Sequence, residues 1–133
     1  MSKQVTIETL LKQKEKLQNK DEKKLALFIE SLEGEIVIAQ PDRALCLETI
    51  TMTQNDATVA QADVHMVYNI VISPNLKDAE LQKQFGCVEP TDIVDLIFEP
   101  GEVSMIAGYG LELAGYSSDI NSVVRKVDRE LKN

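Results

Sequence analysis

The feature that most restricts the fold of this chain is the alternation of proline and glycine after residue 73. Pro74 closes one apolar segment, Pro90 and Pro100 each open a new one, and Gly86 and Gly115 each end one. Proline is tolerated in the first turn of a helix but not in its interior, and glycine readily adopts the left-handed conformation that ends helices. The chain between residues 75 and 115 is therefore predicted to form short helices and not one long one.

Three helices are expected in this region. The first covers about 76–85, with Asn75 as its N-cap; the second opens at 90–91, and the third opens at 100–102. In the last two segments, apolar residues recur at helical spacing and define an inward face. They are Ile93, Val94, Ile97 and Phe98 in the second, and Val103, Ile106, Ala107, Leu111 and Ala114 in the third.

The pattern upstream has the period of β-strands. Two β-rich runs, 25–30 and 35–39, flank a short connection that contains Gly34, and this order predicts a β-hairpin. Pro41 cannot donate a hydrogen bond within a sheet, so it ends the second strand, and with Asp42 it opens a helix predicted over 42–53.

Three further segments have helical spacing. Over 57–72 the apolar period favours a helix, although its last part, 67–72, also fits a buried strand. At the N-terminus, Thr6 is a predicted N-cap for a lightly apolar helix that runs to about residue 20. The final predicted helix covers about 118–131.

These elements together predict an α+β fold that is mainly α-helical. It has an N-terminal helix, one β-hairpin at about 25–39, and a compact bundle of five to six short helices. We expect two parts: a basic, loosely packed N-terminal helix at 1–24, and a single globular domain at 25–133. With 133 residues, of which 44% are hydrophobic, the chain has enough apolar material for a core without disulfides or metals.

The charge is uneven along the chain. The net charge is −8, yet residues 1–24 contain seven lysines against four acidic residues, and the remaining chain has a net charge of −11. Most of the surface would repel a phosphate backbone, so nucleic acid is not an expected partner.

No targeting signal is recognised in the sequence. The N-terminal residues lack the apolar segment of a signal peptide, and no apolar run approaches the ~20 residues of a membrane helix. The expected location is therefore the cytoplasm, with no membrane partner. Cys46 and Cys87 are then expected to be reduced thiols, and neither has a second cysteine or a histidine at zinc-ligand spacing.

The candidates for chemistry are few. His65, the one histidine, shares a helical face with Tyr68 and could act as a general base, but no nucleophile is found at a suitable spacing, so a structural role is favoured. Four carboxylates could supply oxygen ligands to a cation: Asp92, Asp95, Glu99 and Glu102. Pro100 breaks the helical spacing between Glu99 and Glu102, so an acidic face exposed to solvent is the favoured interpretation. The sequence predicts no catalytic residue, cofactor or metal.

The glycines at 108 and 110 also need an interpretation. A dinucleotide-binding loop requires its glycines directly after a strand, whereas Gly108-Tyr109-Gly110 lies within a helical pattern. Close packing of helices, or contact with a partner, is the favoured reason for small residues here.

The order of residues between 68 and 107 is more informative than the composition. It includes YNIVISPNLKD at 68–78, FGCVEP at 85–90 and IFEPGE at 97–102. This block resembles the XkdN-like tail assembly chaperones of PBSX-type phages and prophages. The upstream SLEGEI at 31–36 and PDR at 41–43 fit the hairpin and following helix of that family, so the resemblance covers nearly the whole chain.

The resemblance implies a non-enzymatic function. Proteins of this kind are thought to bind the tape measure protein and keep it soluble in the bacterial cytoplasm until tube subunits polymerise around it, and they are not expected in the mature virion. The resemblance also implies two further partners, a frameshift-extended product of the same gene and the tail tube protein. A homo-oligomer is a separate expectation. The alternatives are a structural minor tail protein retained in the particle and a small enzyme that uses His65.

A chaperone for a long helix needs an apolar groove. Two groups of residues are candidates for such a surface, and ordinary core packing is the alternative for each member. They are Leu10, Leu11 and Leu17 in the N-terminal helix, and Val103, Ile106, Tyr109 and Leu111 in the third Pro-opened segment.

Overall fold

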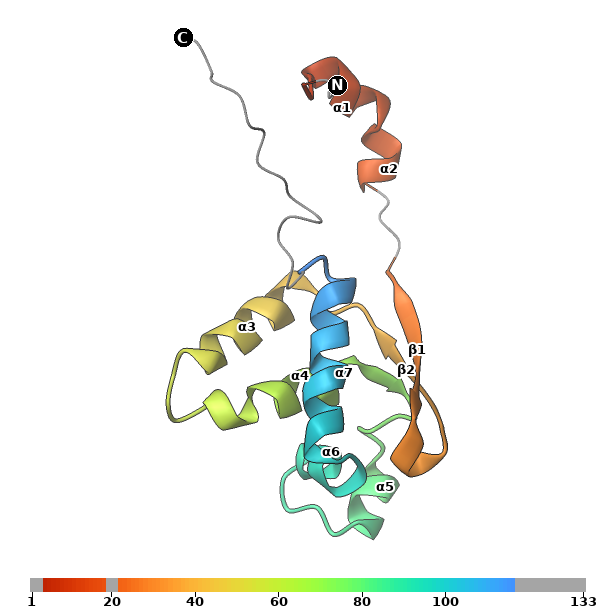
Figure 1. Ribbon diagram of the computed structural model, residues 1–133, viewed down its shortest axis with the longest axis vertical. Helices are drawn as coiled ribbons and strands as arrows, with labels where there is room; N and C mark the ends of the chain where they lie inside the picture. The colour runs from red at the N-terminus through yellow and green to blue at the C-terminus, as the bar shows by residue number, and fades with distance from the viewer. Residues whose placement is uncertain (1–3, 19–21, 117–133) are drawn as a thin grey trace.

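The structure is a computed structural model that describes residues 4–18 and 22–116. Over these ranges a small antiparallel sheet lies beside a group of short helices (Figure 1), which confirms the predicted α+β, mainly α-helical fold. The final helix predicted over 118–131 lies outside the described residues.

The N-terminal segment forms two helices where one was predicted. Thr6 caps α1 (Ile7–Lys12) as expected, because its Oγ1 accepts a hydrogen bond from the Thr9 backbone N–H at 3.1 Å. The chain turns at Gln13, and α2 (Lys14–Gln18) follows. Neither helix buries a residue, and Figure 1 shows both standing apart from the sheet and the other helices.

The predicted hairpin is present. Strands β1 (Lys24–Ile29) and β2 (Gly34–Ala39) pair antiparallel, and a 3-10 turn, η1 (Glu30–Leu32), joins them. The residue in the left-handed conformation is Glu33, with φ of 51°, and not the neighbouring Gly34. A third strand, β3 (Val71–Ser73), pairs with the other edge of β2, so the sheet has the order β1-β2-β3.

The helix predicted over 42–53 is confirmed as α3 (Arg43–Thr53), capped by Asp42, whose Oδ1 accepts from the Leu45 N–H at 2.8 Å. The helix predicted over 57–72 is shorter than expected. A 3-10 turn, η2 (Val59–Gln61), precedes α4 (Ala62–Ile70), and the chain then enters β3. Pairing with β2 explains this end, because Val71 lies opposite Ile38 in the sheet and takes an extended conformation.

The three helices marked by proline and glycine are present as α5 (Ala79–Gln84), α6 (Asp92–Ile97) and α7 (Pro100–Leu113). The predicted cap of the first is wrong. Asp78 caps α5, with its Oδ1 accepting from the Leu81 N–H at 2.8 Å, whereas Asn75 accepts from the Lys77 N–H in the preceding turn. Five helices, α3 to α7, thus follow the hairpin within the described residues.

Helix α4 lies at the centre of the core, in contact with α3, α6 and α7. Met66, Val67 and Ile70 of α4 are at most 1% exposed, and they pack with apolar residues from the sheet and from α6 and α7. Helices α7 and α4 lie close together at Gly110, where a Cβ atom would lie 2.6 Å from the Ile70 Cδ1 and 3.7 Å from the Met66 Sδ. This confirms the packing interpretation of that glycine. Within the described parts of the chain, no helix is long and apolar enough to cross a membrane.

Candidate functional site

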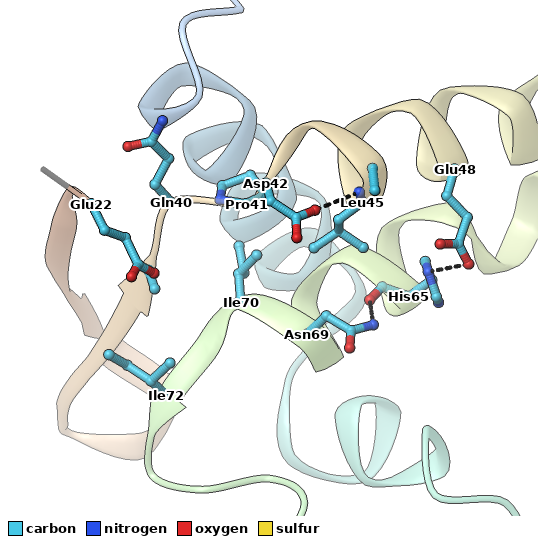
Figure 2. Close-up of a pocket in the computed structure, with 12 residues that line it drawn as sticks. Glu22, Gln40, Pro41, Asp42, Leu45, Glu48, His65, Asn69, Ile70 and Ile72 are labelled. Atoms are coloured by element: carbon cyan, nitrogen blue, oxygen red, sulfur yellow. Dashed lines mark hydrogen bonds and ion pairs between the residues drawn. The ribbon is translucent and has the colours of Figure 1, made fainter. Parts of the chain in front are cut away.

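Two hollows in the surface of the described chain are candidate sites. The first is a cleft of about 720 Å³ beside His65, where α3 and α4 meet the end of β2 (Figure 2). Its floor is apolar and its walls hold carboxylates and amides. The lining residues are Glu22, Ala39, Gln40, Pro41, Asp42, Ala44, Leu45, Glu48, His65, Asn69, Ile70 and Ile72.

Several polar groups of this cleft have partners within the fold. The His65 Nε2 lies 3.0 Å from the Glu48 Oε1, which joins α4 to α3. The Asn69 Nδ2 donates to the His65 carbonyl oxygen at 2.9 Å, and the Lys77 Nζ donates to the Asn69 Oδ1 at 3.0 Å. Asp42 is engaged as the cap of α3. Of these contacts, the one between His65 and Glu48 connects two helices.

Among the described residues, no side-chain nucleophile lines the cleft beside His65. Its lining in the described chain includes no Ser, Thr, Cys, Lys or Tyr. Tyr68, which shares the helix with His65, lies outside this lining, and its hydroxyl oxygen accepts from the Gln82 Nε2 at 3.3 Å. A histidine and a carboxylate alone can transfer a proton, but nucleophilic catalysis needs a third group.

The acidic residues between 92 and 102 do not converge either. Asp92 Oδ2 accepts from the backbone N–H groups of Val88 and Glu89, at 3.1 and 2.9 Å, and so supports the loop before α6. Glu102 serves the start of α7 instead. Among the described residues, no group of three or more His, Cys, Asp or Glu side chains could hold a metal ion.

The two cysteines differ in environment. Cys46 is 1% exposed, and burial, followed by the nearby Asp42 carboxylate, raises the pKa of its thiol. Cys87 is only partly buried.

We therefore predict that iodoacetamide alkylates Cys87 well before Cys46 in the native protein, because Cys46 is inaccessible and its reactive thiolate is disfavoured. Mass spectrometry of digested samples taken over time measures both rates. In urea the two rates should converge. Equal rates in the native protein would contradict the burial of Cys46.

The second hollow is an apolar groove between β1 and α7, with a volume of about 460 Å³. We call it the β1–α7 groove. Its lining residues are Ala26, Leu27, Phe28, Ile29 and Glu30 on one side, and Glu102, Met105, Ile106 and Tyr109 on the other. Three large side chains in it remain open to solvent: Phe28 is 63% exposed, Met105 62% and Tyr109 39%.

Glu102 fixes the two walls of this groove. Its Oε1 accepts from the Glu99 N–H at 2.8 Å, closing the first turn of α7, and from the Ser31 Oγ at 2.9 Å, which ties the hairpin turn to α7. The bond from the Glu99 N–H, followed by the bond from Ser31, lowers the pKa of the Glu102 carboxyl below its ordinary value of 4.5.

Because this pKa is lowered on folding, the ionised Glu102 stabilises the folded state above the ordinary pKa, and that stabilisation is lost as the pH falls through the lowered value. We predict that Glu102→Gln lowers the melting temperature at neutral pH and that the difference from the wild type shrinks in acid below 4.5. Circular dichroism melts at several pH values measure this. Glu112→Gln, at the other end of α7, controls for loss of charge, and a difference that does not change with pH would contradict the assignment.

The predicted binding residues differ in burial and location in the structure. Val103 and Ile106 are 4% and 2% exposed and belong to the core, so α7 presents neither of them as an open surface, although Ile106 forms part of the floor of the groove. Leu111 is partly buried and packs against the core. Tyr109 lies in the groove and is exposed.

The other predicted group, Leu10, Leu11 and Leu17, is exposed on α1 and α2 and takes no part in the groove of the same chain. Sequence reasoning missed Phe28 and Met105. A signal for Phe28 existed: in β1 the residues alternate, and Phe28 occupies the outward position between the inward Leu27 and Ile29.

Comparison with known proteins identifies the family of this chain. The family model described as phage XkdN-like tail assembly chaperone protein matches residues 7–128. The chain therefore belongs to this family of phage tail assembly chaperones. No curated protein and no solved structure matches it.

Proposed function

We propose that this chain binds the tape measure protein and keeps it soluble while the tail tube assembles, without catalysing a reaction. The family gives the general role in tail assembly. The observation that carries the binding is the β1–α7 groove, whose lining includes the exposed residues Phe28, Met105 and Tyr109.

The groove suits an amphipathic helix as its ligand. Apolar grooves accept the i, i+3, i+4 residues of such a helix. Aromatic residues and methionine are enriched at binding surfaces, and the flexible thioether of Met105 can adapt to different side chains. A tape measure polypeptide presents a long series of such segments, and covering them would keep it from aggregating.

The charge of the chain complements this role. Its net charge is −8, so chaperone molecules bound along one client would repel one another and other complexes. The same charge argues against nucleic acid as a partner. We propose that the protein acts in the host cytoplasm and leaves the client before the particle is complete. Two further partners are proposed, the tail tube protein and a frameshift-extended form of the chain.

Co-purification tests the proposal. A tagged copy of the chain, co-expressed with the tape measure protein of the same phage, should retain that protein on the affinity resin after a high-salt wash. Purified virions should lack the chain. Failure to retain the tape measure protein would contradict the proposed binding, and a fixed number of copies per virion would favour a structural minor tail protein instead.

A further inference from the structure

We propose that the N-terminal segment of one copy docks in the β1–α7 groove of a second copy when no client is present. We call residues 4–18, which contain α1 and α2, the arm. One part of this proposal rests on the proposed function: the arm competes with the client because the client binds in the same groove.

The arm has an apolar face that is exposed with respect to the described residues. Ile7 is 77% exposed, Leu11 65% and Leu10 48%, and no residue of α1 or α2 is buried. These three positions follow the i, i+3, i+4 spacing of a helix that binds a groove. Helices this short are marginal in water alone, so docking would stabilise them.

Charge makes the groove a suitable place for this face. The arm contains Lys12, Lys14 and Lys16 against Glu8 and Glu15, and residues 1–24 as a whole have seven lysines against four acidic residues. Glu30 and Glu102 line the groove, on a body that is strongly acidic from residue 25 onward. Apolar side chains can therefore fill the centre of the groove while lysines face carboxylates at its rim.

A second copy is the occupant because of where the arm leaves the body. The arm joins β1 at its Lys24 end, whereas the groove is formed by 26–30 and by the first part of α7. Figure 1 shows the arm standing apart from this region of its own chain. Each copy provides one arm and one groove, so two copies can exchange arms reciprocally and leave neither surface uncovered.

The exchange predicts opposite effects of two kinds of variant on the client. Substitutions in the arm should abolish self-association and leave the groove free, so client binding should stay equal or strengthen. Substitutions in the groove should weaken both interactions. The two surfaces can thus be separated experimentally.

The first test uses the full chain without any client. Sedimentation velocity over a range of concentrations should show a monomer–dimer equilibrium for the wild type. Dimerisation should weaken at least tenfold in two variants: the Leu10→Asp/Leu11→Asp double variant and the Phe28→Asp variant. It should not weaken in the control variant Leu96→Asp, which alters an exposed leucine of α6 outside the groove. A monomeric wild type, or an arm variant that dimerises normally, would overturn the proposal.

The second test identifies the contact. A photo-crosslinking amino acid at position 11, in a mixture of ¹⁴N- and ¹⁵N-labelled chains, should join the arm to peptides containing 26–30 or 102–109 of the other isotope. Crosslinks found only within one isotope would mean that the arm folds onto its own chain, and crosslinks elsewhere would exclude the groove; either result overturns the proposal. Because no tape measure protein is used, the outcome does not depend on whether the proposed function holds.

Discussion

Gly110→Ala is expected to make the domain less stable than Gly108→Ala, although both replace a glycine of the same helix. At Gly108 a Cβ meets nothing within 4 Å, so the substitution gains helix propensity, about 0.5–1 kcal/mol. At Gly110 the added carbon would lie 2.6 Å from the Ile70 Cδ1, so that side chain must shift. Because Cδ1 is the far end of a side chain, we expect a cost at the low end of the range of about 1–3 kcal/mol for overpacking. Urea unfolding of the two variants measures the difference.

A second substitution tests the cause. Ile70→Val removes the Cδ1 atom that the new carbon would contact, and on its own it should cost about 0.5–1.5 kcal/mol. In the Gly110→Ala background, Ile70→Val should lower the free energy of unfolding by less than it does in the wild type. The space left by the Cδ1 atom then accommodates the new methyl group. Strict additivity of the two changes, or equal stability of the two alanine variants, would contradict the close approach of α7 to α4.

Tyr109→Asp and Phe28→Asp are expected to weaken binding of the tape measure protein strongly. Both side chains are exposed in the β1–α7 groove, so the domain should fold, while an aspartate would place a charge in the contact. Exposed aromatic anchors of this kind commonly contribute about 2 kcal/mol or more to an interface, which corresponds to about a thirtyfold loss of affinity. Titration of a fluorescently labelled tape measure segment with each purified variant measures this.

Leu96→Asp is the matched control for these variants. Leu96 is also exposed, at 51%, but it lies on α6 and does not line the groove. It should bind the segment as the wild type does. If all three variants lose affinity equally, the added negative charge alone explains the loss and the groove is not the client site. If none of them loses affinity, the client binds elsewhere.

Local signals were sufficient to predict most of the fold. Proline at the start of α7 and the Asp42 cap of α3 act within one turn of the chain, so their effects can be read without tertiary information. The hairpin follows from alternation in two adjacent runs. These elements form where the sequence predicts them, apart from shifts of a residue or two at their ends.

The differences arise where a distant element decides the outcome. Val71 and Ile72 continue an apolar pattern that fits a helix. They nevertheless form strand β3 with Ser73, because β3 pairs with an edge of β2. Asp78 and Asn75 are both good caps, and only the geometry of the turn, in which Asn75 bonds Lys77, selects Asp78. Glu33 adopts a left-handed conformation, with φ of 51°, which the sequence did not predict.

The candidate site was predictable only in part. Helical spacing correctly marked an apolar face on α7, but it cannot tell a core residue such as Val103 from the exposed Tyr109 at the edge of that face. The groove also needs a wall from β1, more than 70 positions away in the chain from its partner on α7, and the Ser31–Glu102 hydrogen bond that joins the two. Neither could be inferred from spacing.

The most direct test of the central claim is the solubility of the tape measure protein itself. The protein is expressed alone, with the wild-type chain, and with the Phe28→Asp/Tyr109→Asp double variant, and its amount in the supernatant after centrifugation is measured by quantitative blotting. We predict that the wild-type chain moves most of the tape measure protein into the supernatant, and that the double variant, present at equal level, leaves it in the pellet. A tape measure protein that is equally soluble in all three cultures would contradict the account.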